Sequence, residues 1–388
     1  MSNCNFNSNN AIKGNNVYWL WTVEDFLNKY TQINDYDYIY IQNGVGTPNS
    51  TIVLNKKGIT ISSQGGVTFD AKGGNLHFEV TGDNVLIEKI TFRNFNFAGD
   101  GGAIVWKGNY GKLENCNFIN NTVRNHGGSV FWAGYSGILI NSIFTNNTVG
   151  IAGAGVFWAG YNGRITGCTF ISNTGNQYGS VYWAGNKGTL TNSTFIKNHA
   201  SIYGAGVFWQ GINGTLTSST FINNTAQHGA GVFWNNRNGT LTSSTFIDNT
   251  ATDGAGVFWA FPDGTLTSST FTNNHANHDG GAIRWDGTNG ILIDSSFTDN
   301  TAGNNGGAIL WKIISPIVNC SFVNSKSIKS NGIYATKDLN INGGKGIVYI
   351  FTNGTLSGIS IVVLNNETYY YPPNTNINLT KQNRKTTK

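Results

Sequence analysis

The stretch GAGVFWQGINGTLTSSTFINNT, residues 204–225, decides the fold. It holds a Val-aromatic-Trp run, a Gly-bounded turn, a run centred on Leu, and a Phe followed three residues later by Asn. The same unit recurs through the middle of the 388-residue chain in steps of 25 or 26 residues. Its Trp lies at Trp106, Trp132, Trp158, Trp183, Trp209, Trp234, Trp259, Trp285 and Trp311. A fixed period in this range is the signature of a solenoid.

The short runs inside each unit predict β-structure. Each unit holds two or three runs of three to six residues broken by Gly or Asn, and helical periodicity is absent. In a parallel β-helix, each run pairs with its equivalent in the coils above and below. We therefore predict an all-β protein, a parallel β-helix of 25–26-residue coils.

Alternation within the first run divides its residues between two faces. The position two before Trp is always Ile or Val, so this row and the Trp row share one face, which we expect to point inward. The row between them includes Tyr182, Phe208, Phe233 and Phe258 and continues as Arg284, so we expect it to point outward.

The second half of the unit must contain a bend. Leu216 lies five residues before Phe221, an odd spacing that one flat strand cannot place on a single face. Ser or Cys occupies the position two before each Phe, which marks the bend. Three residues after Phe an unbroken Asn column begins at Asn121, and Asn tolerates left-handed backbone angles and can form a ladder of stacked amides.

The cysteines belong to the Ser/Cys column and act as small fillers there. Cys116 and Cys168 are two coils apart, about 9.6 Å at a coil spacing of about 4.8 Å. A disulfide requires Cα atoms about 4.4–6.8 Å apart. We therefore predict no disulfides among Cys4, Cys116, Cys168 and Cys320.

The flanking segments suggest six divisions of the chain. Residues 3–19 match the repeat, with Val17-Tyr18-Trp19 in place of its aromatic run, and Thr22 can cap a short helix that carries Phe26 on its apolar side. The divisions are a stray coil (1–21), a capping helix (22–35), irregular first coils (36–92), regular repeats (93–338), terminal coils (339–366), and a linker into a truncated immunoglobulin-like domain (367–388).

Composition excludes several classes of function. No apolar run of about 18 residues exists, so no helical membrane span is expected. The net charge is +5 and the charged residues are scattered, so nucleic-acid binding is not expected; a solvated terminus explains the basic tail, Lys381–Lys388. The first residues show neither a basic flank nor an apolar core of a signal peptide.

One polar column offers candidate chemistry. His228, Asp253 and Asp279 lie six residues before Trp on consecutive coils, and His275 and His278 are close by in sequence. Stacked carboxylates could recruit a weakly bound cation such as Ca²⁺ or serve in glycoside cleavage. Asp, Asn and His are also ordinary turn residues, so a solvated turn is the competing interpretation. No other cofactor is expected.

The outward aromatic row is the second candidate site. Contiguous exposed aromatic side chains mark interaction surfaces, and sugar rings stack on such faces. The row formed by Tyr182, Phe208, Phe233 and Phe258 is therefore a candidate glycan-binding stripe. Two alternatives remain: the rings only stabilise the sheet, or another segment covers them.

The Gly-Gly-Ala-Ile motif, seen at 101–104, 280–283 and 306–309 and paired with Phe-x-x-Asn, resembles the repeat of chlamydial polymorphic membrane proteins. The fuller unit with its Trp resembles adhesin-like surface proteins of methanogenic archaea. Both resemblances imply a right-handed β-helix displayed outside the cell, and the second implies the immunoglobulin-like domain. Extracellular or cell-surface localisation is expected on this ground.

Three function classes follow. The first is a non-enzymatic adhesin module, a monomer that binds glycans or proteins on another cell surface. The second is a polysaccharide lyase or hydrolase of the β-helix type. The third is a passive spacer. The absence of a recurrent acid or base in the repeat favours the first class.

Overall fold

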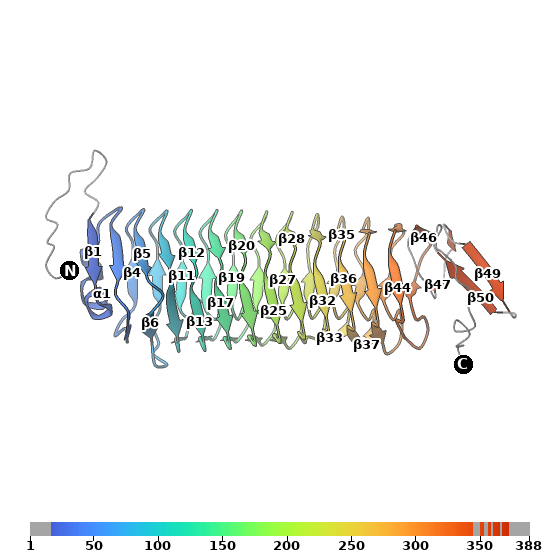
Figure 1. The fold of residues 1–388 in the computed structure, drawn as a ribbon, viewed down its shortest axis with the longest axis horizontal. Coiled ribbons are helices and arrows are strands. Elements are labelled where there is room, and N and C mark those ends of the chain that lie inside the picture. The colour runs from blue at the N-terminus through green and yellow to red at the C-terminus, as the bar shows by residue number, and fades with distance from the viewer. Residues whose placement is uncertain (1–16, 344–349, 353–355, 358–359, 365–366, 372–388) are drawn as a thin grey trace.

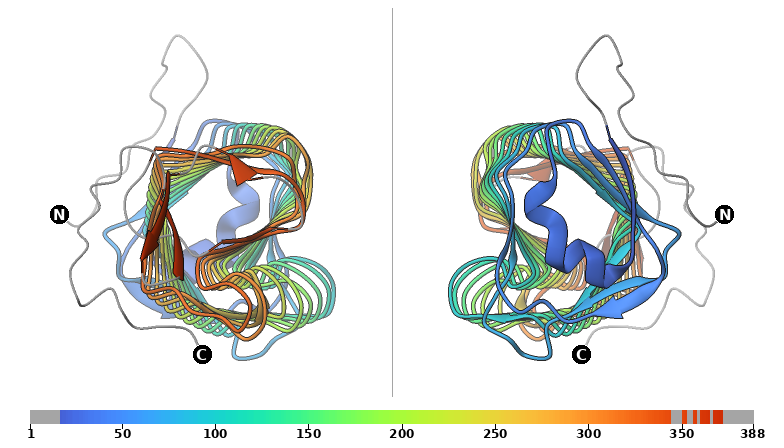
Figure 2. Two further views of the ribbon diagram at one scale, coloured as in Figure 1. Left: turned by 90° about the vertical axis from the view of Figure 1, so that its right-hand side faces the viewer. Right: turned by 90° about the vertical axis from the view of Figure 1, so that its left-hand side faces the viewer.

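The computed structural model describes residues 17–343, 350–352, 356–357, 360–364 and 367–371. Apart from residues 360–364 and 367–371, these residues form an elongated parallel β-solenoid in which equivalent strands of successive coils pair side by side (Figure 1). Seen along the long axis, the coils superpose around a common core (Figure 2). Three long sheets run the length of this solenoid.

The Trp sheet contains the Val-aromatic-Trp runs. In the described residues it has 13 strands: β4 (Ile52–Leu54), β7 (Phe78–Val80), β11 (Ile104–Trp106), β15 (Val130–Trp132), β19 (Val156–Trp158), β23 (Val181–Trp183), β27 (Val207–Trp209), β30 (Val232–Trp234), β34 (Val257–Trp259), β38 (Ile283–Trp285), β42 (Ile309–Trp311), β45 (Ile333–Ala335) and β47 (Ile350–Thr352).

The Leu sheet contains the runs centred on Leu. Its 15 described strands are β1 (Tyr18–Trp21), β2 (Tyr38–Ile41), β5 (Thr60–Ser63), β8 (Leu86–Glu88), β12 (Lys112–Glu114), β16 (Ile138–Ile140), β20 (Arg164–Thr166), β24 (Thr189–Thr191), β28 (Thr215–Thr217), β31 (Thr240–Thr242), β35 (Thr265–Thr267), β39 (Ile291–Ile293), β43 (Ile317–Val318), β46 (Leu339–Asn342) and β48 (Leu356–Ser357).

The Phe sheet follows the bend after the Leu sheet. Its 12 described strands are β3 (Gly44–Gly46), β6 (Val67–Asp70), β9 (Ile90–Arg93), β13 (Asn117–Ile119), β17 (Ile143–Thr145), β21 (Thr169–Ile171), β25 (Thr194–Ile196), β29 (Thr220–Ile222), β32 (Thr245–Ile247), β36 (Thr270–Thr272), β40 (Ser296–Thr298) and β44 (Ser321–Val323).

Two small sheets lie in the turn that leads from the Phe sheet to the Trp sheet. One contains β10 (Asn96–Phe97), β14 (Thr122–Val123), β18 (Thr148–Val149), β22 (Thr174–Gly175) and β26 (His199–Ala200). The other contains β33 (Thr250–Asp253), β37 (His275–Asp279) and β41 (Thr301–Ala302). This turn carries the polar column identified in the sequence.

The core consists of stacked side chains, two per coil from the Trp sheet and one each from the Leu sheet and the Phe sheet. Val207 and Trp209 are fully buried, as alternation predicted, and so are Leu216 and Phe221. From Trp106 to Trp285, neighbouring indoles are stacked with ring centroids 4.5–5.2 Å apart. Gly214 is required beside this stack, because a Cβ there would lie 2.0 Å from Nε1 of Trp209.

The predicted bend between Leu and Phe is confirmed. Leu216 lies in β28 and Phe221 in β29, and Ser218 between them adopts a left-handed φ of 49°. The buried Asn column also forms the expected ladder, but its residues are not the left-handed ones. The residue before each column Asn takes that conformation: Asn223, not Asn224, has a φ of 54°.

The ladder satisfies the buried amide of each Asn. Asn224 Nδ2 donates to Phe195 O in the preceding coil and to Asn249 Oδ1 in the next, each at 3.0 Å. Asn224 Oδ1 in turn accepts from the backbone N–H and the Nδ2 of Asn198, also at 3.0 Å. The amides therefore tie each coil to both neighbours.

The three described cysteines are free and buried, as predicted. Burial raises the pKa of the Cys116, Cys168 and Cys320 thiols to about 12. Cys4 lies outside the described residues.

The N-terminal capping helix is also confirmed. Helix α1 (Val23–Lys29) begins after the N-cap residue Thr22 with a capping box. The side chains of Thr22 and Asp25 each accept a hydrogen bond from the other residue's backbone N–H. A 3-10 turn (Tyr30–Gln32) follows the helix. The helix crosses the N-terminal end of the solenoid (Figure 2). Fully buried Phe26 packs there against Phe69 and Phe78, with ring centroids 5.4 and 6.4 Å away.

The ends differ from the sequence interpretation in two respects. Placing Trp19 in the Trp row is wrong, because β1 belongs to the Leu sheet and Trp19 pairs with Ile39. At the other end, β49 (Ser360–Leu364) pairs antiparallel with β50 (Glu367–Tyr371), so a division at residue 367 would split a hairpin. Residues 1–16 and 372–388, which include most of the expected stray coil and immunoglobulin-like segment, lie outside the described residues.

The described residues include no helix with the length and apolar character needed to cross a bilayer.

Candidate functional site

The polar column lies on the turn before the Trp sheet, where backbone pairing aligns its members. His228 pairs with Asp253, and Asp253 pairs with Asp279, so the three residues occupy consecutive coils as expected. The solvated-turn interpretation is wrong for the two aspartates. Asp253 keeps only 5% of its surface exposed and Asp279 only 8%.

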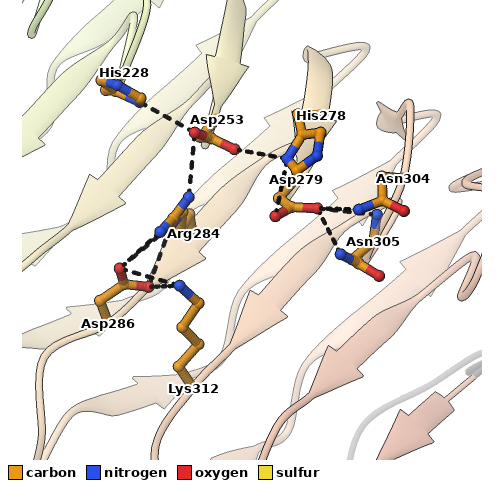
Figure 3. A network of polar contacts seen from close by, with 9 residues as sticks. All are labelled: His228, Asp253, His278, Asp279, Arg284, Asp286, Asn304, Asn305 and Lys312. Atoms are coloured by element: carbon orange, nitrogen blue, oxygen red, sulfur yellow. Dashed lines mark hydrogen bonds and ion pairs between the residues drawn. The ribbon is translucent and has the colours of Figure 1, made fainter.

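Asp253 is the centre of the network of polar contacts (Figure 3). Its Oδ2 lies 3.2 Å from His228 Nδ1 and 3.1 Å from an Arg284 guanidinium nitrogen. Burial raises the pKa of Asp253, but the contact with His228 and the positive charge of Arg284 outweigh burial and hold that pKa below its ordinary value. The carboxylate is therefore ionised at neutral pH.

Asp279 and His278 extend the network to the next coil. His278 Nδ1 lies 3.1 Å from Asp279 Oδ2 and 3.6 Å from Asp253 Oδ1. The other oxygen of Asp279 accepts hydrogen bonds from Asn304 and Asn305. His278 thus joins the two carboxylates, whereas the sequence had grouped His228 with them.

His275 does not join this group. Its Nδ1 contacts Thr301 Oγ1 at 2.7 Å, and its Nε2 contacts Asn277 Oδ1 at 3.1 Å. Because β37 is a strand, residues 275 and 278 point in different directions, and only the second reaches the aspartates.

The basic side chains of the network are paired with carboxylates. Arg284 lies between Asp253 and Asp286, 3.1 Å from each, and Lys312 Nζ lies 3.3 Å from Asp286. The guanidinium also stacks 4.7 Å above the Phe258 ring. Arg284 therefore links the polar network to the aromatic row of the Trp sheet.

The aromatic row points outward but is not exposed, so its expected role as an open stripe is wrong. Phe208, Phe233 and Phe258 retain 3%, 6% and 8% of their surface. They form one apolar cluster with Tyr178, Tyr182, Tyr203 and Ala260. Tyr178 and Tyr203 come from the turn before the Trp sheet and lie against the row, with Tyr178 4.4 Å from Phe208 and Tyr203 4.7 Å from Phe233.

A different aromatic row is exposed. Tyr110, Tyr135 and Tyr161 lie on three consecutive coils, in the turn from the Trp sheet to the Leu sheet, and are 53%, 42% and 47% exposed. The Tyr110 and Tyr135 rings lie 4.9 Å apart, and Lys187 Nζ lies 5.4 Å from the Tyr161 ring centroid. The sequence signal was an aromatic residue three or four positions after Trp on these coils.

Comparisons with known proteins support the architecture. A family model described as a right handed beta helix region matches residues 116–260, and the Chlamydia polymorphic membrane protein repeat matches residues 268–284 and 294–310. No curated protein sequence matches the chain. The resemblance to archaeal adhesin-like proteins stays a prediction.

Several solved structures share the fold. A PL6 alginate lyase in complex with a trisaccharide has a TM-score of 0.59 and 12% identity, with 92% of this chain and 91% of that chain covered. Alginate lyase AlyF-OU02 with G6 has a TM-score of 0.54 and 12% identity, covering 93% and 92%. PL6 alginate lyase AlyGC has a TM-score of 0.57 and 13% identity, covering 91% of this chain and 55% of that one.

These likenesses establish the fold alone, because the identities are so low. Together with the family model, they confirm the expected right-handed parallel β-helix, including its hand.

Proposed function

We propose that this chain is a non-enzymatic, adhesin-like module of a cell surface, and that it binds glycans along an outer face of the β-helix. The polymorphic membrane protein repeat supports surface display. Two of the structural neighbours are complexes with a trisaccharide and with G6, which makes oligosaccharides the first ligand class to test. Proteins on another cell surface are the second partner class.

The exposed tyrosine row carries this proposal. Tyr110, Tyr135 and Tyr161 present large aromatic surfaces on consecutive coils, spaced by about 4.8 Å along the axis. Tyrosine combines an apolar face with a hydroxyl that can donate and accept hydrogen bonds. A row of such side chains suits an extended ligand that offers alternating apolar faces and hydroxyl groups, as a polysaccharide does.

The pairing of the charged groups favours binding without cleavage. A general acid or base must come within hydrogen-bond reach of the substrate. Arg284 already forms ion pairs with both Asp253 and Asp286, and Asp253 is buried. This network resembles a structural ion cluster more than a set of groups available to a substrate.

A glycan array tests the proposal with the full chain and the triple variant Tyr110→Ser, Tyr135→Ser, Tyr161→Ser. We expect the wild type to bind one or more polysaccharides and the variant to lose that binding with an unchanged circular dichroism spectrum. The matched control is Tyr18→Ser with Tyr36→Ser, two tyrosines that are 70% and 47% exposed away from the row. The control should bind like the wild type.

A cleavage assay on the same polysaccharides separates the remaining functions. Formation of new chain ends would favour a lyase or hydrolase and contradict a non-enzymatic module. No binding to any glycan or cell surface would favour a passive spacer. Equal binding by the triple variant would remove the tyrosine row from the binding site.

A further inference from the structure

Three metal-ligating atoms converge where β33 and β37 meet. Asp253, His278 and Asp279 each contribute one such atom, and the three atoms lie within 4.8 Å of one another. His278 Nδ1 lies 3.6 Å from Asp253 Oδ1 and 3.1 Å from Asp279 Oδ2. The carboxylates form the buried floor, while the His278 side chain is 58% exposed. The group therefore borders solvent on the side of His278.

Asp253 supplies an independent sign that a ligand belongs here. Its Oδ1 atom is buried and has no hydrogen-bond partner among the described residues. A buried polar atom without a partner is costly, and an ionised oxygen more so. This oxygen points at His278 and not at Arg284, which contacts Oδ2 (Figure 3).

Surrounding groups hold both carboxylates in a ligating orientation. Asp279 Oδ1 accepts hydrogen bonds from Asn304 Nδ2, from the Asn305 backbone N–H and from Asn305 Nδ2, at 3.2, 3.2 and 2.7 Å. Arg284 and His228 lie 3.1 and 3.2 Å from the other oxygen of Asp253, Oδ2. Each aspartate thus has one oxygen fixed by neighbours and one left for the cluster, the arrangement by which outer groups orient metal ligands.

The ligand types, and not the spacing, distinguish between classes of cation. Around a tetrahedral ion with bonds of about 2.0–2.1 Å, neighbouring ligand atoms lie about 3.4 Å apart. The distances from His278 Nδ1, 3.1 and 3.6 Å, lie on either side of this value. Ca²⁺ takes six to eight oxygen ligands at longer distances, whereas one imidazole with two carboxylates suits zinc-like ions.

We propose that Asp253, His278 and Asp279 form a binding site for a divalent cation of the zinc class, with solvent completing its coordination. This site replaces the set His228, Asp253 and Asp279 suggested by sequence, and the weak Ca²⁺ site expected with it. His228 serves as an outer group. The bound ion joins two consecutive coils at the turn before the Trp sheet.

Calorimetric titration of the untagged full chain with Zn²⁺ at neutral pH tests the site. We expect one Zn²⁺ per chain, binding more tightly than Ca²⁺, and a rise in the unfolding temperature with Zn²⁺ concentration. His278→Ala removes a direct ligand, so it should weaken binding by more than the loss of about 10–100-fold that is typical of outer-group changes. This change is well tolerated structurally, since His278 is exposed.

His275→Ala is the matched control, an exposed histidine three residues away on the same strand that contacts Thr301 instead. It should bind Zn²⁺ like the wild type. The proposal is overturned if the wild type shows no stoichiometric Zn²⁺ binding, if His278→Ala binds as tightly as the wild type, or if both histidine variants lose affinity equally.

Discussion

At the scale of single residues, the Asn ladder shows how a polar side chain can serve a buried position in every coil. Asn224 is fully buried, and its amide makes bonds to the coils on both sides. A hydrophobic residue of the same size would leave these backbone and side-chain groups without partners. The column is therefore polar for reasons of hydrogen bonding and requires no ligand.

Asn224→Ala should lower the free energy of unfolding by at least about 2 kcal/mol, because each buried group left without a partner costs about 1–3 kcal/mol. The backbone N–H of Asn198 would lose its acceptor and Phe195 O would lose a donor, while Asn198 Nδ2 would keep its bond to Phe170 O. Thermal and denaturant unfolding measure the loss. Asn125→Ala, at an exposed turn position, is the control and should stay within about 0.5 kcal/mol of the wild type.

Asp70 gives the protein a specific sensitivity to acid. Burial raises the pKa of Asp70, but hydrogen bonds from Asn94, from the Lys72 backbone and from Arg93 outweigh burial and hold it below the ordinary value of 3.8. A carboxyl group whose folded-state pKa is depressed stabilises the fold above its unfolded-state pKa. This contribution is lost as the pH falls through the folded-state pKa.

The unfolding temperature of Asp70→Asn should therefore depend less on pH than that of the wild type between about pH 5 and pH 2. Differential scanning calorimetry across this range tests the prediction. Because other aspartates titrate in both proteins, only the difference between the two curves reports on Asp70. Parallel curves would show that Asp70 does not couple folding to protons.

The sequence predicted side-chain direction better than exposure. Alternation correctly placed Val207 and Trp209 inside and Phe208 outside. It could not show that Tyr178 and Tyr203 cover the outward row, because these residues come from a different turn, whose path strand periodicity does not specify. The burial of Asp253 was missed for the same reason, since its neighbours Arg284 and His278 lie one coil further on.

At the scale of elements, helix α1 closes the N-terminal end of the core. Its apolar side chain Phe26 contacts Phe69 and Phe78, which would otherwise end the stacked core in contact with water. Gly46 allows this close approach, because a Cβ there would lie 2.3 Å from Val23 Cγ1. The capping signal at Thr22 made this element predictable from local sequence alone.

Phe26→Ala should detach the helix and expose the first coils. Truncating a buried Phe costs about 3–5 kcal/mol, and we expect faster amide hydrogen exchange in β3 and β4 together with a greater tendency to aggregate. Asn28→Ala, an exposed position on the same helix, provides the comparison and should leave exchange unchanged. Unaltered protection in Phe26→Ala would mean that the helix is not needed to close the core.

Strand β1 shows that local sequence was insufficient to predict which sheet a terminal strand joins. Residues 17–19 resemble the repeat, yet β1 pairs in the Leu sheet, because the route of the chain through α1 to β2 fixes its register. A repeat motif identifies equivalent strands only where the copies on both sides keep the same period. The first coil has a neighbouring coil on one side only, so its motif does not determine which sheet its strand joins.

At the scale of the whole molecule, the period was sufficient to predict the architecture. A coil of fixed length can stack only if equivalent strands pair, so the fold followed from the spacing of Trp and Phe. Function did not follow in the same way, because the repeat positions build the core and the ladder. The candidate sites lie where individual coils depart from the repeat, at Tyr110, His278 and Arg284.

We expect a monomeric rod in solution. The 13 described strands of the Trp sheet, spaced by about 4.8 Å, span roughly 58 Å. Small-angle X-ray scattering should show an elongated particle, and light scattering should give the mass of one 41.9 kDa chain. A mass of two chains would contradict the expected monomer and direct attention to pairing between the ends of two solenoids.

The parallel pairing of the coils has a mechanical consequence. The hydrogen bonds between strands run along the rod, so a force that pulls its ends apart acts on the bonds of one coil at a time (Figure 1). The rod would unzip turn by turn, and each coil of 25 or 26 residues would release about 80–90 Å of extended chain. A tether built in this way absorbs a sudden pull by lengthening in steps while its remaining coils stay folded.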